Sequence, residues 1–433
     1  MPTEFAAMVA IDWADQNHAW ALQAGTSKVE TGAIDHTPEA IDVWAAELRM
    51  RFGGQAVAVA LEQSRGPLVF MLTKYEHLVI FPVHPTVLVN YRKSFRPSGA
   101  KDDPSDARLL LDILVLHRDK LRRFNPDTAE TRTLQFLVEE RRKFVHEKTR
   151  YSNRITSHLK MYFPQVLDWF DEIGSNIAAE FLGRWPSLEK LQRARPATVE
   201  RFFIDHNSRN AERIKERLEQ IRKAIPATTD VAVVTSSSAA VLGWAVLLKQ
   251  VLTAISAYDQ QINELAQAHP DYALVKSFPG AGPAMAPRLI AAMGSQRERY
   301  QSATEIQQYS GIAPVLASSG KLHWVHWRWA CPKFLRQTFH DWALHSIAYS
   351  DWAREYYEQQ RAKGKRRNTA IRSLAFKWIR ILFRCWKDRK PYDEAVYQGA
   401  LTARLLNLQP TALAVELQRK NVAGFKKIAR AGA

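Results

Sequence analysis

Cysteine is nearly absent from this sequence. Only Cys331 and Cys385 occur in a chain of 433 residues. Two cysteines are too few for the disulfide framework of a small secreted domain, and they supply too few thiolates for a structural zinc site. This scarcity favours a reducing compartment, and neither cysteine carries a visible function.

Long hydrophobic runs are also lacking. No basic segment precedes the first apolar residues, and Asp12 interrupts their run, so a secretory signal peptide is not expected. The longest apolar stretch, residues 239–248, ends at Lys249. Its length is about half of what crosses a bilayer. We therefore expect a cytoplasmic protein.

Acidic residues are the minority charge. Lys and Arg number 61 against 44 Asp and Glu, which gives a formal net charge of +17 and an isoelectric point near 9.8. Such an excess favours a polyanionic partner over a small apolar ligand. A merely basic surface gives the same balance, so the charge alone leaves both interpretations open.

The first hundred residues alternate strand and helix signals. A Thr cap followed by Pro marks the start of the first helix. Three strands, a helix, a strand, a helix and a strand is the order of an RNase H-like α/β sheet. The strands are expected at residues 7–12, 18–23, 28–35, 56–62 and 78–84, and the helices at 37–53 and 68–75.

The remaining sequence is mainly helical, and no internal repeat is evident. Residues 126–163 have almost no helix breakers and carry apolar residues at near-heptad spacing among many Arg and Lys. This pattern predicts a long helix or coiled coil that ends at Pro164. The expected regions are an RNase H-like domain at 1–125, a basic coiled-coil helix at 126–164, a helical linker region at 165–268, a mainly α-helical C-terminal domain at 269–400 and a basic tail at 401–433.

Carboxylates gather at one edge of the expected sheet. Asp12 and Glu62 each end an apolar strand, and Asp103 and Asp106 open the next helix on one face, with Asp102 as an uncertain neighbour. Clustered carboxylates need a counter-charge, and oxygen-rich sites suit Mg²⁺ or Mn²⁺. Such ions can assist phosphodiester cleavage. Acidic residues also favour helix N-termini, which explains the last pair equally well.

Two short turns are candidate contacts to nucleic acid. Gly280 and Gly282, in "FPGAGP", precede an apolar helix. Such a turn can offer backbone N–H groups to a phosphate, or it can be a tight interhelical connection. Ser318 and Ser319 lie in "SSGK", which ends at Lys321. A serine there can be a nucleophile if a base or metal activates it, although Ser-Ser-Gly is also ordinary loop chemistry.

Aromatic and basic residues alternate after this turn. Trp324, Trp327 and Arg328 belong to a strip that suits stacking and charge neutralisation with single-stranded or distorted nucleic acid. The alternative is an element that packs its tryptophans in a core. Residues 360–380 carry eight basic residues and no acidic one, which indicates a phosphate-binding surface. The densest run in this segment is Lys365, Arg366 and Arg367.

With these motifs in order, the chain resembles the transposases of the insertion-sequence family numbered one hundred and ten, the bridge-RNA-guided serine recombinases. Their RuvC-like domain carries an Asp, Glu, Asp, Asp tetrad whose last pair reads Lys-x-Asp-x-x-Asp-Ala. "KDDPSDA" matches from Lys101, with Asp102 at the variable position, and this register selects Asp103. The resemblance spans roughly residues 5–163 and 270–385.

The C-terminal motifs carry the second half of the resemblance. "FPGAGP" matches the proline–glycine turn of the family, and "GIAPVLASSG" matches the element that holds its nucleophilic serine. The nucleophile therefore falls on Ser319, with Ser318 as its neighbour. The following segment, "HWVHWRWACPKFLRQ", departs from the glycine-rich basic turn that is frequent in the family.

The resemblance implies an RNA-guided recombinase that cuts and rejoins donor and target DNA of a mobile element. The tetrad of Asp12, Glu62, Asp103 and Asp106 would hold Mg²⁺, and Ser319 would form a phosphoserine link. A structured guide RNA, a homo-oligomer with composite sites and a prokaryotic nucleoid location are also implied. The expected nucleic-acid contacts are Lys101, Arg141, Arg142, Arg154, Gly280, Gly282, Lys321, Trp324, Trp327, Arg328, Lys365, Arg366 and Arg367.

Two other functions fit the same residues. The first is a RuvC-like endonuclease that cuts branched DNA with metal-activated water and makes no use of the serine. The second is a catalytically silent nucleic-acid-binding protein whose carboxylates are structural.

Overall fold

A computed structural model of the chain describes residues 4–95, 103–206, 210–320 and 322–399, with the backbone alone at Asp103. The chain divides into two compact units, Met1–Pro126 and Asp127–Ala433. The predictions for Lys101, Asp102, Lys321 and the tail at 401–433 lie outside the described residues.

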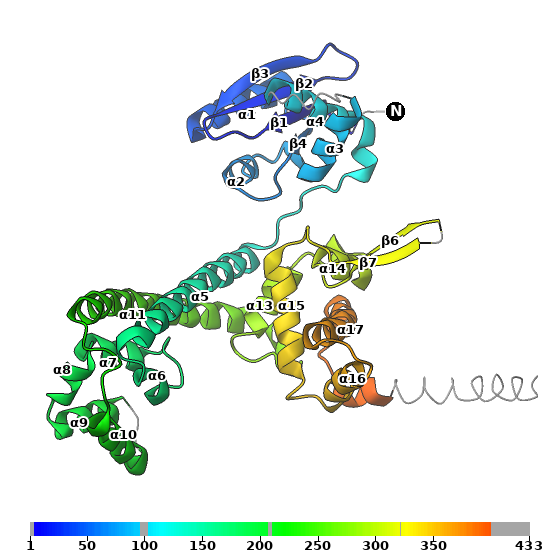
Figure 1. The fold of residues 1–433 in the computed structure, drawn as a ribbon. Helices are drawn as coiled ribbons and strands as arrows, with labels where there is room; N and C mark the ends of the chain where they lie inside the picture. The colour runs from blue at the N-terminus through cyan, green and yellow to red at the C-terminus, as the bar shows by residue number, and fades with distance from the viewer. Residues whose placement is uncertain (1–3, 96–102, 207–209, 321, 400–433) are drawn as a thin grey trace, which may run out of the picture. The chain divides into compact units, whose positions relative to one another are not determined.

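A five-stranded mixed sheet forms the centre of the first unit (Figure 1). Strand β1 pairs antiparallel with β2 and parallel with β4, while β2 pairs antiparallel with β3 and β4 pairs parallel with β5. The succession of three strands, a helix, a strand, a helix and a strand is confirmed. The spatial order of the strands is β3-β2-β1-β4-β5. Their bounds are β1 (Ala7–Asp12), β2 (Asn17–Gln23), β3 (Glu30–Asp35), β4 (Val57–Leu61) and β5 (Leu78–Pro82).

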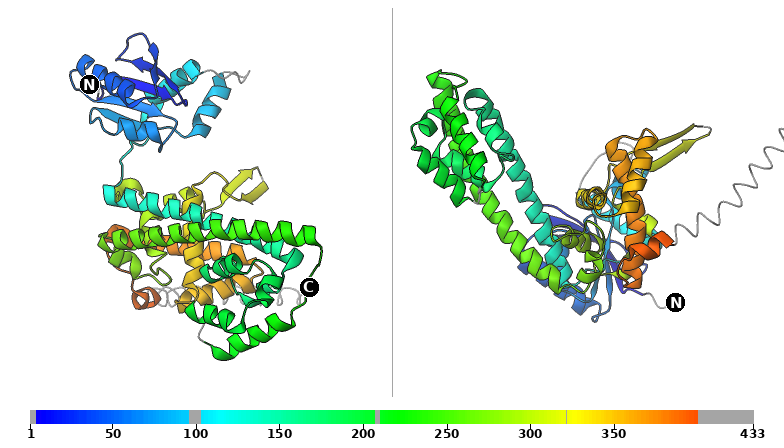
Figure 2. Two further views of the ribbon diagram at one scale, coloured as in Figure 1. Left: turned by 90° about the vertical axis from the view of Figure 1, so that its left-hand side faces the viewer. Right: turned by 90° about the horizontal axis from the view of Figure 1, so that it is seen from below.

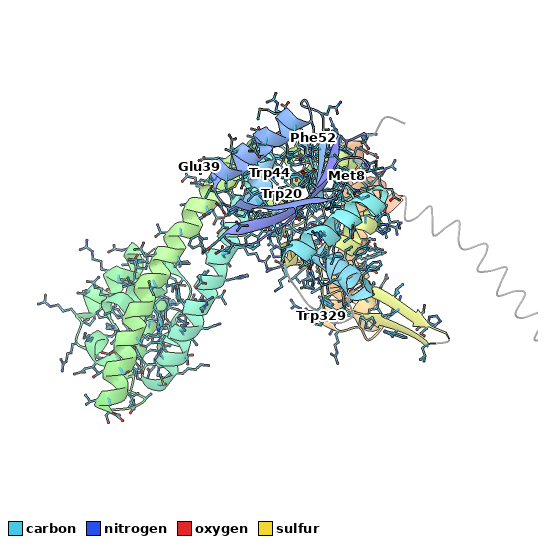
Figure 3. All side chains as sticks on the ribbon, turned by 90° about the horizontal axis from the view of Figure 1, so that it is seen from above. Met8, Trp20, Glu39, Trp44, Phe52 and Trp329 are labelled. Atoms are coloured by element: carbon cyan, nitrogen blue, oxygen red, sulfur yellow. The ribbon has the colours of Figure 1, made fainter. Side chains whose placement is uncertain are left out.

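Helices cover both faces of this sheet, so every residue of β4 is buried. One core lies under α1 and α2, and Figure 3 labels two of its rings, Trp20 on β2 and Trp44 on α1. The other core lies under α3 and α4. A short 3-10 turn, η1 (Arg118–Lys120), follows the last of these helices. The helices are α1 (Pro38–Arg51), α2 (Pro67–Leu72), α3 (Pro85–Phe95) and α4 (Asp103–His117).

Two long helices, α5 and α11, run antiparallel through the second unit (Figures 1 and 2). Leu134 near the start of α5 shares a core with Ala266 near the end of α11. Leu159 near the end of α5 packs with Val241 near the start of α11. The long helix predicted after Pro126 is confirmed, but its partner within the same chain was not foreseen. The two helices are α5 (Ala129–Tyr162) and α11 (Val231–Ala268).

Helix α11 is also long and apolar enough to cross a membrane, judged by length and composition alone. The sequence predicts an apolar stretch of about half a membrane span that ends at Lys249. The helix continues for about five turns beyond that charged residue. In its most apolar window, 22% of the residues are buried. The remaining apolar side chains are therefore partly or fully accessible in this structure.

Five short helices connect α5 to α11. Their core is aromatic: the ring of Phe181 contacts those of Phe170, Phe202 and Phe203 within a centroid distance of about 6 Å. These helices are α6 (Val166–Trp169), α7 (Asn176–Arg184), α8 (Leu188–Gln192), α9 (Pro196–Asp205) and α10 (Ala211–Lys223).

The C-terminal part of the second unit packs helices and one hairpin around buried tryptophans. Trp342, Trp378 and Trp386 are fully buried, and the indole N–H of Trp378 donates to the hydroxyl of Ser346 over 2.7 Å. The elements are α12 (Tyr272–Lys276), α13 (Ala286–Met293), η2 (Arg297–Arg299), α14 (Ala303–Tyr309), β6 (Val315–Ser319), β7 (Leu322–His326), α15 (Lys333–Ser346), α16 (Asp351–Ala362) and α17 (Arg367–Asp388).

Candidate active site

Asp12 and Glu62 lie next to each other at one end of the sheet. β1 and β4 are parallel neighbours in which Ile11 pairs with Leu61, so the residue that follows each of them is also adjacent. Ile11 and Leu61 belong to the core under α1 and α2. Because side chains alternate along a strand, Asp12 and Glu62 face the opposite side, which α4 covers. Asp12 is buried and Glu62 is half-buried.

Helix α4 adds a third carboxylate on this side of the sheet. Asp106 is 1% exposed, and it forms a bidentate ion pair with Arg92 of α3. The Nε and one terminal nitrogen of Arg92 donate to the two carboxylate oxygens over 2.8 and 2.5 Å. A buried carboxylate needs such a partner, because an unpaired charge away from water is strongly destabilising.

Asp103 begins α4, three residues before Asp106. Residues three apart on a helix share a face, so its backbone position agrees with the predicted spacing. Because its side chain is outside the description, as are Lys101 and Asp102, the choice of Asp103 over Asp102 stays a prediction.

The carboxylates of this edge suit a hard divalent ion, since each offers oxygen ligands. Among the side chains that the structure describes, however, no three acidic, histidine or cysteine groups are gathered closely enough to hold an ion. Both oxygens of Asp106 are bound to Arg92. Each oxygen keeps a further lone pair, so a metal ion at Asp106 would bind against the positive charge of Arg92.

The candidate serines lie on the β6–β7 hairpin, where both are exposed. Ser318 is paired with His323 and Ser319 with Leu322. Because cross-strand partners share a face and successive residues alternate, the two serines face opposite sides of the hairpin. Each is accessible to a phosphodiester. His323 is a candidate base for Ser318 and lies on the other face from Ser319.

The tryptophans of the aromatic strip have different environments. Trp329 is 80% exposed at the base of the hairpin (Figure 3), and Trp324 on β7 is 42% exposed. The ring of Trp327 lies under two guanidinium groups, those of Arg372 and Arg336, at 4.3 and 5.1 Å from its centroid. Trp327 thus joins the hairpin to α15 and α17, whereas the other two rings are open to stacking.

The glycine turn before α13 has a structural explanation at one position. Gly280 has φ of +75°, and a Cβ there would lie 2.8 Å from the backbone nitrogen of Ser346 on α15. Only glycine fits so close an approach in that conformation. Gly282 is exposed, and a Cβ there would meet nothing within 4 Å. Packing therefore accounts for Gly280 and leaves Gly282 unexplained.

Several of the predicted basic contacts have partners within the chain. Arg141 pairs with Asp259 of α11, and the guanidinium of Arg154 lies 4.4 Å from the ring centroid of Trp244. Arg328 donates to the carbonyl of Ala313 over 3.4 Å, and Lys365 donates to the side chain of Gln360. Arg366 and Arg367 are exposed at the start of α17.

Sequence reasoning missed Arg92. Its signal was present, because the basic stretch "NYRKSFRPSGAK" precedes the aspartates directly. The net positive charge of the sequence favoured a polyanionic partner, whereas Arg92 neutralises a carboxylate of the chain itself.

Comparisons with known proteins agree with this arrangement. Residues 9–164 match a model described as a transposase, the DEDD domain of IS110 elements, and residues 272–358 match the transposase model of the IS116/IS110/IS902 family. A protein of the mini-circle element IS117 from Streptomyces coelicolor, named as a transposase, is 26% identical over 89% of this chain and 94% of its own length. The 43.6 kDa protein of insertion element IS110 from the same organism is 25% identical over 88% of this chain and 94% of its length.

A third relative extends the same pattern to another organism. The 42 kDa protein of insertion element IS900 from Mycobacterium paratuberculosis is 26% identical over 82% of this chain and 86% of its own length. The mixed sheet with its acidic edge lies in the part that the DEDD model matches, and both matched domains are transposase domains. Transposases bind and cut DNA, and a DEDD domain implies dependence on a divalent metal ion. The two domains of this chain are those of the IS110/IS116 family of transposases.

Proposed function

We propose that this transposase is an RNA-guided recombinase, which cuts and rejoins donor and target DNA of an insertion element through a phosphoserine intermediate. The observation that carries the proposal is the adjacent register of Asp12 and Glu62 under the helix that bears Asp106. Three carboxylates from separate elements on one side of a sheet suit phosphodiester chemistry better than a structural role.

The proposed metal ligands are Asp12, Glu62, Asp103 and Asp106. A bound Mg²⁺ or Mn²⁺ would supply charge stabilisation at the scissile phosphate. Around it, the burial of Asp12 and Asp106 excludes water from the ligand oxygens. Arg92 holds Asp106 in a fixed orientation until an ion competes for it.

The proposed nucleophile is Ser319. Its hydroxyl oxygen loses its proton and forms a bond to phosphorus, and the bond from phosphorus to one sugar oxygen breaks. That oxygen leaves as a hydroxyl group by taking up one proton, so the step releases no net proton. Rejoining reverses these steps with the hydroxyl of another strand. The exposure of Ser319 on β6 supports this role, because a strand of DNA can reach it without rearrangement of a core.

The same proposal includes the finer features of the fold and assembly. The order of the sheet supports an RNase H-like domain at residues 1–125, and the length of α5 supports a coiled coil at 126–164 in a homo-oligomer. Residues 165–268 serve as a helical linker region and 269–400 as the domain of the serine. Composite sites, a guide RNA and a nucleoid location follow from the resemblance to RNA-guided recombinases.

A metal-dependent, RuvC-like nuclease is the second candidate, because it requires the same acidic edge. It needs Asp12 and Glu62 but no serine, because a water molecule attacks the phosphate.

The two candidates are distinguished by Ser319→Ala, with Ser318→Ala as the matched control on the other face of the hairpin. A recombinase loses strand cleavage and the covalent protein–DNA species in a denaturing gel only with Ser319→Ala. Unchanged cleavage by that variant would identify the nuclease. Asp12→Asn should abolish cleavage in both cases, and a protein that cleaves equally well with this change has no carboxylate-dependent activity.

A further inference from the structure

A cavity of about 900 Å³ lies within the second unit, away from the serine hairpin. Its walls come from α5, α11, α12, the turn before α13, α13 itself and α15. Its volume is in the range of pockets that hold a ligand the size of a nucleotide. We call it the α5–α15 cavity.

The cavity has an excess of positive charge. Four cationic side chains line it, against two carboxylates. Asp259 is bound to Arg141 over 2.5 and 2.9 Å, and Asp341 is bound to Arg288 over 2.9 Å. Both carboxylates are thus engaged by other cations. The two remaining cationic groups are Arg142 and Lys276.

Arg142 has a buried donor without an acceptor. Its Nε is inaccessible to solvent and has no hydrogen-bond partner among the residues that the structure describes. Burial lowers the pKa of Arg142, and the charge of Arg288 acts in the same direction, against the weaker opposing effects of Asp341 and Glu139. An unsatisfied buried donor costs roughly 1–3 kcal/mol, and more for a charged group. An anion in the cavity would offset part of the cost of burying this charge by lying beside the guanidinium.

The other walls of the cavity suit a sugar–phosphate chain. Lys276 lies at 5.7 Å from the ring centroid of Tyr272, which leaves its ammonium hydrogens available to an acceptor. The side chains of Gln260, Asn263, Gln267 and Gln337 also line the cavity, and amides can both donate to and accept from sugar hydroxyls or base edges. Pro283 and Ala284, beside the exposed Gly282, also line the cavity.

We propose that the α5–α15 cavity binds a backbone phosphate of nucleic acid, with Arg142 and Lys276 as its ligands. A guanidinium offers several donors in a plane that matches phosphate oxygens, and an ammonium adds a second charge. The proposal rests on the proposed function only in taking nucleic acid as the source of the phosphate. RNA and DNA share this group, so the test includes both.

The test measures binding of the full-length protein by fluorescence anisotropy. The probes are a 30-base-pair DNA duplex, a 30-nucleotide single-stranded DNA and a 30-nucleotide RNA hairpin, each at several salt concentrations. We expect Arg142→Gln to weaken binding of at least one probe by roughly 10-fold and to lower the salt slope by about one. The double variant with Lys276→Gln lowers that slope by about two.

Matched controls come from the exposed side of the same helix. Arg150→Gln and Lys143→Gln remove one cation each from α5, at side chains that are 58% and 70% exposed and ion-paired within the helix. They should leave the affinity within about 2-fold of the wild type. Affinity and salt slope that are the same for Arg142→Gln as for Arg150→Gln, with every probe, would overturn the proposal.

Two further measurements distinguish a loss of phosphate binding from a folding defect and from a failure of the proposed function. Because Arg142→Gln removes an unsatisfied buried donor, the variant should keep the thermal midpoint of the wild type or raise it. If Arg142→Gln fails to fold, the single variant Lys276→Gln supplies the test. Asp12→Asn should bind all probes normally, so a loss of binding in the cavity variants and a loss of cleavage in Asp12→Asn are independent outcomes.

Discussion

At the residue scale, the pairing of Asp106 with Arg92 governs what the acidic edge can do. The carboxylate is buried, and both of its oxygens accept from one guanidinium. A metal ion and the arginine therefore compete for the negative charge of one carboxylate, although each oxygen keeps a further lone pair. This competition makes the stability of the first unit a measure of metal binding that needs no DNA.

Arg92→Gln should destabilise the first unit by about 3 kcal/mol without metal, because it leaves Asp106 buried and unpaired. Added Mg²⁺ should restore more stability to this variant than to the wild type, since the ion can then use Asp106 freely. Chemical denaturation with and without Mg²⁺ measures both effects. The exposed neighbour Lys93 supplies the control, as Lys93→Gln. Equal responses of Arg92→Gln and the wild type to Mg²⁺ would exclude Asp106 as a ligand.

A second residue, His18, makes the stability of the first unit depend on pH. His18 is fully buried, accepts a hydrogen bond from the backbone of Ala14, and lies 2.8 Å from a ring nitrogen of His36. Burial first, and then the charge of His36, lower the pKa of His18 to about 4. The folded protein therefore keeps this ring neutral at a pH where the unfolded chain protonates it. The resulting stability is complete above pH 6.5 and is lost as the pH falls toward 4.

We expect the free energy of unfolding of the first unit to fall by about 2 kcal/mol from this residue between pH 7 and pH 4.5. His18→Gln cannot be protonated and should show a correspondingly flatter pH profile. Denaturant titrations at several pH values measure the difference, and His84→Gln, at an exposed histidine, is the control. Identical profiles for His18→Gln and the wild type would contradict the assignment.

At the scale of elements, the seam between α5 and α11 holds the second unit together. Leu248 of α11 is fully buried in this seam, whereas its neighbour Leu247 is 43% exposed. Leu248→Ala should cost about 3 kcal/mol, because it removes buried methyl groups and leaves a cavity. Leu247→Ala changes the same residue type one position away and should cost less than about 1 kcal/mol. Urea denaturation followed by tryptophan fluorescence compares them, and similar costs would show that the seam lies elsewhere on α11.

Local patterns made some elements predictable and left others hidden. The order of the sheet followed from apolar runs bounded by turns, and α5 followed from its uninterrupted heptad-like spacing. The pairing of α5 with α11 is a contact across about a hundred residues, and no local pattern encodes it. The partner of Asp106 was missed for the same reason, because Arg92 reaches it from a different helix.

Exposure was equally difficult to foresee. Trp327 and Trp329 are two residues apart in the same strip, yet one is held by two arginines and the other is open to solvent. The sequence predicted the same environment for both, because residue spacing does not show that arginines of α15 and α17 reach only one of them. The positions of Asp12 and Glu62 were easier to predict, because the end of a strand can be recognised from the local sequence. The parallel register of the two strands then brings these residues together.

At the scale of the whole molecule, the division at Pro126 predicts separate unfolding of two units. Each unit has its own buried cores, which do not include residues of the other. We expect calorimetry to resolve two transitions, since units with separate cores can unfold separately. Arg92→Gln should lower only the first unit's transition, and Leu248→Ala only that of the second. A single transition that both variants shift would show that the units unfold together.

The antiparallel pair of α5 and α11 also has a consequence during synthesis. α5 ends at Tyr162 and α11 begins at Val231, so about 70 residues are translated between them. At a synthesis rate of roughly 5–20 residues per second, the apolar face of α5 remains without α11 for on the order of 4–14 s. Closing the pair must then overcome the entropy of a long loop, unless α6 to α10 have already folded and shortened it. Folding of the intervening helices is therefore expected to set the rate at which the second unit matures on the ribosome.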